Sequence, residues 1–207
     1  MWNCLDLSPV IKRFTPIITF VGLCWLVYAV NSLVWHGQLD QYGIIPRHLG
    51  GLPGILWAPF LHASFRHLAA NSVPLLILGG VICARSKAEF WTVAVAGTLL
   101  TGGLTWVFAR NASHIGASGL VFGFFGYLAS LAYFRRTFGT LVLSAACIVA
   151  YGGMLKGLVP TSTPVSWEGH IAGLVTGIVL AGVASKLNPP LKERETKPTG
   201  LAATIEK

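Results

Sequence analysis

The sequence predicts an all-α membrane protein: a bundle of six transmembrane helices with a long, partly membrane-embedded loop between the first two helices. Of its 207 residues, 54% are hydrophobic and only 11% are charged, whereas soluble domains carry about 25% charged residues. Six uncharged runs of 17 to 20 residues lie along the chain, and a helix needs roughly 17 to 25 apolar residues to cross a bilayer. The basic residues cluster between these runs, as they do around membrane spans.

The six runs cover residues 17–35, 68–84, 90–109, 115–134, 137–155 and 169–185. Backbone groups in lipid must be hydrogen-bonded internally, so each run is expected to be helical. A transmembrane barrel would need alternating segments of about ten residues, which the sequence lacks. The 24 glycines favour close helix packing. We expect a membrane domain over residues 17–186, a cytoplasmic N-terminal segment over 1–16 and a flexible cytoplasmic tail over 187–207.

The distribution of Lys and Arg predicts the orientation of the spans. If both termini are cytoplasmic, eleven of the 15 basic residues lie inside, and the outer side holds only Arg47, Arg66, Arg110 and Lys156. Positive charge is enriched on the cytoplasmic side. We therefore expect a multi-pass protein of a bacterial inner membrane with both termini in the cytoplasm, so that the fourth and sixth runs both begin at the outer face.

Two connections between the runs are unusual. The first, over residues 36–66, is too long for an ordinary loop, since structureless loops beyond about 12 to 15 residues are usually functional or disordered. It is rich in apolar residues and is interrupted by three prolines, which favours short pieces lying in the outer membrane interface. The second, over residues 159–167, is rich in Pro, Ser and Thr and could act as a movable lid.

The fourth and sixth runs each carry one reactive residue near their outer ends. Ser118 follows Gly116 and Ala117 at the start of one run, and His170 opens the other. A helix N-terminus offers free N–H groups and a positive dipole end, which would stabilise an oxyanion. A serine here could instead cap the helix or be a small residue at a helix contact, and the histidine could be structural, bonded to a backbone carbonyl. Ionisable residues inside spans are nevertheless functional by default.

Small residues accompany both positions. Gly119 and Gly123 are four residues apart on one run, and Gly173 and Gly177 are four apart on the other. Such stripes let two helix backbones come close, which a hydroxyl and an imidazole need in order to reach about 2.6 to 3.2 Å. No Asp or Glu lies inside any run, so a serine–histidine pair here would be a dyad.

Further polar side chains open the second run. His67 and Asn71 are four residues apart, hence on one helix face, and their donors could complete an oxyanion hole. They could also be polar contacts between helices. His62 and Trp57 are interpreted as bracing the long loop, and His36, His48 and His114 as interfacial residues without a role.

Together these pieces resemble the rhomboid intramembrane serine proteases. The resemblance rests on the six-run layout and on three motifs in the family's order, His67-x-x-x-Asn71, Gly116-Ala117-Ser118-Gly119 and Gly169-His170-x-x-Gly173. It implies Ser118 as nucleophile and His170 as general base. It also implies that His67, Asn71 and the backbone N–H of Ser118 hold the oxyanion, with Gly116 beside them. The family cleaves spanning helices of other membrane proteins near the outer face, commonly after a small residue.

The chain departs from some members of the family at two positions. Ala58 follows Trp57 where some members carry arginine. Phe122 stands four residues after Ser118 where some carry tyrosine, and it keeps a ring that can pack beneath His170.

We therefore expect an intramembrane serine endopeptidase that acts through Ser118, His170 and an acyl-enzyme. Its partners would be transmembrane protein substrates and membrane lipids, with no nucleic acid, because topology accounts for the net charge of +8. No cofactor or metal is expected, since there is no HExxH motif and no cysteine pair has ligand spacing. Two alternatives stay open: a proteolytically idle rhomboid-like protein that binds or escorts membrane proteins, and a small transporter with polar gates.

Overall fold

The computed structural model describes residues 8–160 and 165–187, and it is helical through most of them. The long helices are α1 (Ser8–Leu33), α5 (Lys87–Phe108), α6 (Ser118–Arg135), α7 (Phe138–Tyr151) and α8 (Trp167–Leu187). One further span is built from three consecutive pieces, α3 (Phe65–Pro74), the π-helical η4 (Leu75–Gly79) and α4 (Gly80–Arg85). A 3₁₀ segment, η5 (Gly152–Leu158), extends α7.

The predicted all-α membrane bundle is confirmed. Within the described chain, five helical stretches are long and apolar enough to cross a membrane: Ile11–Leu33, Phe65–Arg85, Lys87–Phe108, Phe138–Leu158 and Trp167–Leu187. The remaining predicted run forms α6, which has 18 residues and buries ten of them. Helix α1 begins at Ser8, nine residues before the apolar run. Residues 1–7 and 188–207, and with them most of the expected terminal segments, lie outside the described residues.

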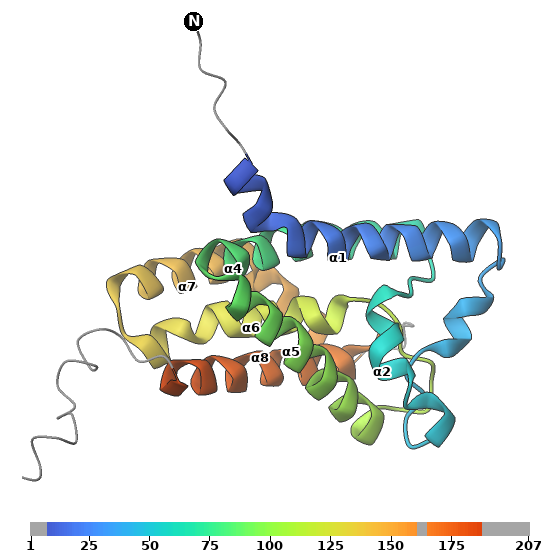
Figure 1. Ribbon diagram of the computed structural model, residues 1–207. Coiled ribbons are helices and arrows are strands. Elements are labelled where there is room, and N and C mark those ends of the chain that lie inside the picture. Colours follow the sequence, from blue (N-terminus) through green and yellow to red (C-terminus); the bar gives the residue numbers. More distant parts are fainter. Residues whose placement is uncertain (1–7, 161–164, 188–207) are drawn as a thin grey trace, which may run out of the picture.

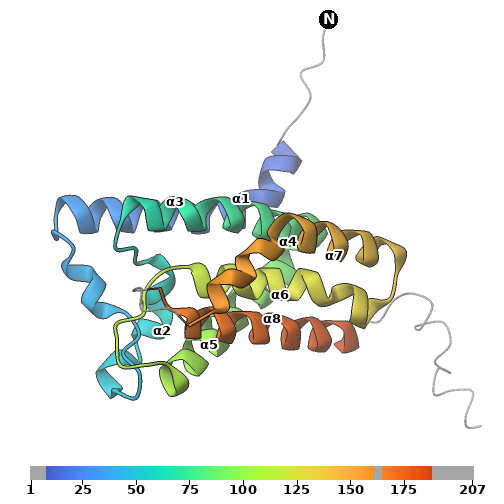
Figure 2. The ribbon, with the colours of Figure 1, turned by 180° about the vertical axis from the view of Figure 1, so that it is seen from behind.

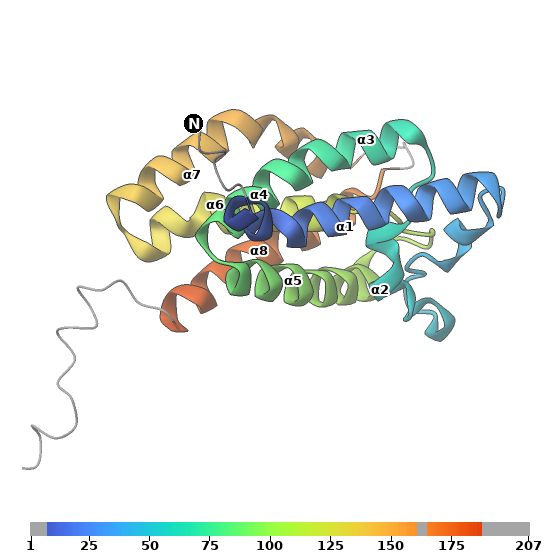
Figure 3. The same cartoon turned by 45° about the horizontal axis from the view of Figure 1, so that its top comes forward.

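Helix α6 occupies the middle of the bundle. It packs against α5, α7 and α8, and Figures 1 and 3 show it between α5 and α7. Seen from behind, α6 and α8 run side by side (Figure 2). Neighbouring helices cover α6, so its glycine-rich surface packs against other helices and not against lipid tails.

The long first connection folds into short helices at one end of the bundle. These are η1 (Gln38–Tyr42), η2 (Leu49–Gly51), α2 (Gly54–Trp57) and η3 (Ala58–Phe60). Helix α2 packs on α5, and η3 packs on α1. Figure 1 shows these pieces at the end where α6 and α8 begin. The expected short pieces are thus present, while their depth in the membrane stays a prediction.

Polar caps fix where several helices begin. Ser64 accepts a hydrogen bond from the His67 N–H at 3.2 Å, Ser86 accepts one from Glu89 at 3.3 Å, and Thr137 forms a capping box with Thr140. Each cap satisfies an N–H group that the first helical turn leaves free. The cap at Ser64 starts α3 just ahead of His67 and so brings His67 and Asn71 to the same end of the bundle as Ser118.

Candidate active site

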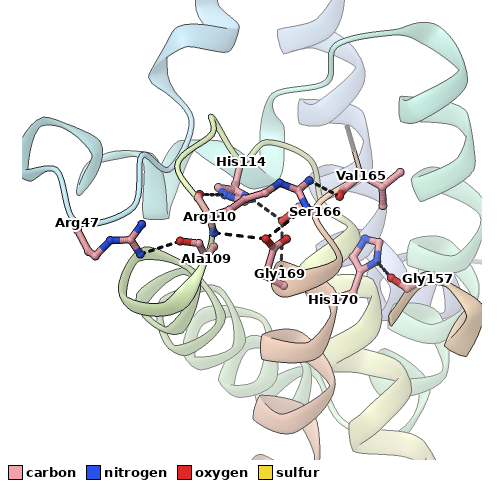
Figure 4. A network of polar contacts seen from close by, with 10 residues as sticks. Arg47, Ala109, Arg110, His114, Gly157, Val165, Ser166, Gly169 and His170 are labelled. Carbon is pink, nitrogen blue, oxygen red and sulfur yellow. Dashed lines mark hydrogen bonds and ion pairs between the residues drawn. The ribbon is translucent and has the colours of Figure 1, made fainter. Parts of the chain in front are cut away.

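Ser118 and His170 meet across the contact between α6 and α8. The Ser118 Oγ lies 2.9 Å from the His170 Nε2, and the His170 Nδ1 lies 2.8 Å from the carbonyl oxygen of Gly157 in η5. Figure 4 shows the His170 ring turned toward Gly157. A carbonyl can only accept a hydrogen bond, so Nδ1 carries the proton and the lone pair of Nε2 faces the serine hydroxyl.

This tautomer determines which of the two residues can accept the proton. A neutral imidazole with a free lone pair at Nε2 can take the hydroxyl proton from Ser118. In the part of the chain that the structure describes, the His170 ring hydrogen-bonds only to Ser118 and Gly157. The group that orients the histidine is therefore a backbone carbonyl, and the pair has the form of a dyad without an acid.

The turn before α6 sets the position of Ser118. Gly116 has a φ of 110°, which side-chain-bearing residues rarely adopt, and its N–H donates to the Ala58 carbonyl at 2.8 Å. A Cβ on Gly116 would lie 2.5 Å from Cε1 of His67. Glycine is therefore required both for the backbone angle and for the close approach of His67. Since Ser118 is the first residue of α6, its N–H has no acceptor within the helix.

The two glycine stripes lie directly against each other. A Cβ on Gly173 would overlap the carbonyl oxygen of Gly119, and one on Gly177 would overlap that of Gly123. Because these backbones touch, a short serine side chain on α6 reaches the histidine of α8.

An aromatic ring supports the histidine from below. The ring of Phe122 stacks on that of His170, with centroids 4.3 Å apart and planes inclined by 13°. Both side chains are buried. Together with the carbonyl of Gly157, this stack restricts rotation of the imidazole.

His67 and Asn71 lie next to the dyad, and His62 holds them. The Asn71 Nδ2 lies 3.1 Å from the His62 Nε2, and the rings of His62 and His67 meet edge to face at 5.0 Å. The His62 Nδ1 faces the Phe60 carbonyl at 3.3 Å, so Nε2 accepts one amide hydrogen of Asn71 and leaves the second available.

His62 does more than the bracing of the long loop that the sequence predicts. It is 1% exposed, and burial lowers its pKa to about 4, with the neighbouring His67 acting in the same direction. It therefore stays neutral and orients Asn71. The spacing of His62 and His67 does not place them on one helix face. The two residues lie on either side of the cap at Ser64, so they do not share a helix.

His114 differs from its sequence interpretation. The sequence predicts an interfacial residue without a role, but His114 is 5% exposed and bonds to Ser166 and Arg110. His36 and His48 are exposed, as expected for interfacial residues. The acid nearest to His170 in the sequence, Glu168, pairs with Arg110 at 3.4 Å.

A cleft gives access to the dyad from one side of the bundle. It is bounded by α3 and α6, by the end of α7 with η5, and by the start of α8, and its lining includes Ala70, Asn71, Pro74, Ser118, Met154 and His170. A second, smaller hollow reaches Ser118 from the side of α5, and its lining includes Thr98, Thr101 and Thr105. The expected lid over residues 159–167 cannot be placed against the cleft, since residues 161–164 lie outside the described residues.

Comparison with known proteins gives a consistent match. A Rhomboid domain family model matches residues 49–187. An uncharacterized protein of Mycobacterium tuberculosis is 39% identical over 197 residues, covering 90% of this chain and 80% of that protein. An uncharacterized protein of Mycobacterium leprae is 36% identical over 193 residues, covering 89% and 75%. A Bacillus subtilis protein provisionally named a rhomboid protease is 29% identical over 143 residues, covering 60% and 66%. With its apolar helices and this match, the chain is an integral membrane protein that belongs to the rhomboid family.

Proposed function

We propose that the protein is an intramembrane serine endopeptidase in which Ser118 is the nucleophile and His170 the general base. The single observation that carries this proposal is the 2.9 Å contact between the Ser118 Oγ and the His170 Nε2. With Nδ1 bonded to the Gly157 carbonyl, the imidazole has the tautomer that a general base needs.

The reaction follows from these positions. Ser118 Oγ attacks the scissile carbonyl carbon while its proton passes to the His170 Nε2, and the carbonyl oxygen becomes an oxyanion. The N–H of Ser118, the second amide hydrogen of Asn71, which lines the cleft with Ser118, and the His67 ring, which lies beside Gly116, would donate to that oxyanion. The amine then leaves with the proton from His170, and water hydrolyses the acyl-enzyme.

The substrate is a transmembrane helix of another protein, unwound locally because a helical peptide bond is shielded and already hydrogen-bonded. The cleft between α3 and η5 is the side on which an extended segment can reach Ser118. The smaller hollow on the α5 side would admit the water. We further propose that the protein lies in a bacterial inner membrane with both termini cytoplasmic, so that cleavage occurs near the outer face.

Cleavage by purified protein tests the proposal. The wild type is incubated in detergent with a panel of single-span proteins, and fragments are identified by sequencing. Ser118→Ala and His170→Ala should each lower the rate by about 10³-fold or more, because each residue acts as part of one unit. Ser130→Ala is the matched control: Ser130 lies on the same helix and bonds to the Gly126 carbonyl at 2.7 Å.

Two results would overturn the proposal. Cleavage that survives in Ser118→Ala would exclude the mechanism. A wild type that cleaves none of the panel and leaves Ser118 unlabelled by a fluorophosphonate would favour the idle, escorting alternative.

A further inference from the structure

His114 is a buried residue that the proposed chemistry does not use, and it connects three separate segments. Its backbone forms an isolated antiparallel bridge with Ile44 of the first loop, in which both N–H···O bonds measure 2.9 Å. Its Nε2 lies 3.0 Å from the Arg110 carbonyl oxygen. Its Nδ1 lies 2.6 Å from the Ser166 Oγ at the start of α8. Figure 4 shows His114 between Arg110 and Ser166.

The Arg110 carbonyl orients the ring of His114. Because that carbonyl can only accept, the Nε2 of His114 carries a proton, and in the neutral ring Nδ1 accepts the hydroxyl proton of Ser166. The Ser166 Oγ in turn accepts from the Gly169 N–H at 3.3 Å, and the Ser166 carbonyl accepts from the His170 N–H at 3.1 Å. Ser166 thus caps α8 and at the same time donates to His114.

The contact between His114 and Ser166 parallels the dyad. His114 precedes Ser118 by four residues, and Ser166 precedes His170 by four residues. Hence the same two chain segments are joined twice, first through His114 and Ser166 at 2.6 Å and then through Ser118 and His170 at 2.9 Å.

Flanking contacts of Arg110 join the same segments. The Arg110 Nη1 lies 3.4 Å from a carboxylate oxygen of Glu168, and its Nη2 donates to the Val165 carbonyl at 2.8 Å. The backbone N–H of Arg110 also donates to a carboxylate oxygen of Glu168 at 3.4 Å. These contacts keep the loop before α6 and the first turn of α8 together, and the 2.6 Å hydrogen bond between His114 and Ser166 is shorter than each of them.

We propose that His114 and Ser166 are positioning residues, and that their hydrogen bond sets the distance between the Ser118 hydroxyl and the His170 imidazole. This inference rests on the proposed protease function. Neither side chain is bonded to that of Ser118 or His170, although both residues line the hollow on the α5 side. Their removal should therefore lower the rate of the chemical step without changing how a substrate is held in the cleft between α3 and η5.

The test compares kcat with KM for a reporter substrate that the wild type cleaves. A misplacement of about 1 Å at a catalytic group can cost about 10²-fold in rate, so Ser166→Ala should lower kcat by about 10- to 100-fold. Its KM should stay within about threefold of the wild-type value. The rate of fluorophosphonate labelling at Ser118 should fall in parallel, and Ser166→Thr, which keeps the hydroxyl, should restore most of both rates.

Two further variants separate positioning from folding. Ser166→Gly removes the hydroxyl, yet glycine is nearly as good a helix cap as serine, so its kcat should fall although α8 still begins normally. Ser113→Ala is the matched control, since Ser113 lies in the same loop and, within residues 8–160 and 165–187, its hydroxyl bonds to the Asp40 carbonyl alone, at 3.1 Å. All assays are run well below each variant's thermal midpoint.

A double-mutant cycle gives the decisive result. If the two residues act through one bond, His114→Leu combined with Ser166→Ala should be no slower than the slower single variant. Losses that multiply, or a kcat for Ser166→Ala and Ser166→Gly equal to that of the wild type, would overturn the inference while leaving the protease function standing. Absence of any Ser118-dependent cleavage by the wild type would instead refute the proposed function itself.

Discussion

Replacing Gly173 by alanine should separate the two residues of the dyad. The added Cβ would overlap the Gly119 carbonyl oxygen, because the distance between these two atoms would be well below 3.0 Å, closer than Cβ atoms come to other atoms in proteins. That oxygen belongs to the α6 backbone and cannot rotate away, so α8 must shift by about 1 Å before the contact becomes tolerable. The Ser118–His170 distance of 2.9 Å would then exceed the range of about 2.6 to 3.2 Å in which a base can take the proton.

The expected magnitudes follow from this shift. A displacement of about 1 Å should lower kcat/KM by about 10²-fold. Overpacking should cost about 1–3 kcal/mol of unfolding free energy, and each kcal/mol lowers the thermal midpoint by about 2–4 °C in a chain of this size. Cleavage of a single-span reporter and thermal unfolding in detergent measure the two effects.

Gly123→Ala provides the matched control at the same helix contact. Its Cβ would lie 3.5 Å from the Gly173 carbonyl oxygen, which is ordinary van der Waals contact, so activity and thermal midpoint should stay near the wild-type values. If Gly173→Ala also keeps the wild-type midpoint and kcat/KM, then the close backbone contact between α6 and α8 is not needed for the dyad distance.

Three further predictions concern other parts of the structure. Because the pKa of His62 in the fold, about 4, lies below its ordinary value of 6.5, its contribution to stability is complete above pH 6.5. That contribution, about 3 kcal/mol, is lost as the pH falls from 6.5 to 4. The drop in unfolding free energy between pH 7 and pH 4.5 should therefore be smaller in His62→Gln than in the wild type by about this amount. Phe122→Leu removes the ring stacked on His170 and should lower kcat about 2- to 12-fold. Phe122→Tyr keeps a ring at this position and should keep kcat near the wild-type value. Glu89 accepts the Tyr127 hydroxyl at 2.5 Å at the far end of the bundle, so Glu89→Ala should cost about 3 kcal/mol in thermal unfolding while kcat of the folded enzyme is unchanged.

The sequence was sufficient for the parts of the fold that depend on local composition. Run length and the absence of charge predict spans because a bilayer has a fixed thickness. Glycines spaced four apart predict a close helix contact because only small residues allow it. The meeting of Ser118 with His170 followed from the topology, since an even number of crossings brings both helix starts to one face.

Other features depend on contacts between distant segments, for which the sequence carries no periodic signal. His114 reads as an isolated polar residue in a short loop, and only the fold shows that Ile44 and Ser166 reach it. The orienting partner of His170 is a backbone carbonyl, at Gly157, and every residue has one. The break of the second span into α3, η4 and α4 follows Pro74, but a proline alone does not specify a π-helical turn.

Covalent labelling tests the central claim most directly. Purified wild-type protein is treated with a fluorophosphonate, digested, and mapped by mass spectrometry, alongside His170→Ala. We predict a single adduct on Ser118 in the wild type and a labelling rate at least about 10²-fold lower in His170→Ala. An adduct on another serine, or equal labelling of Ser118 with and without the imidazole, would contradict the activation of Ser118 by His170.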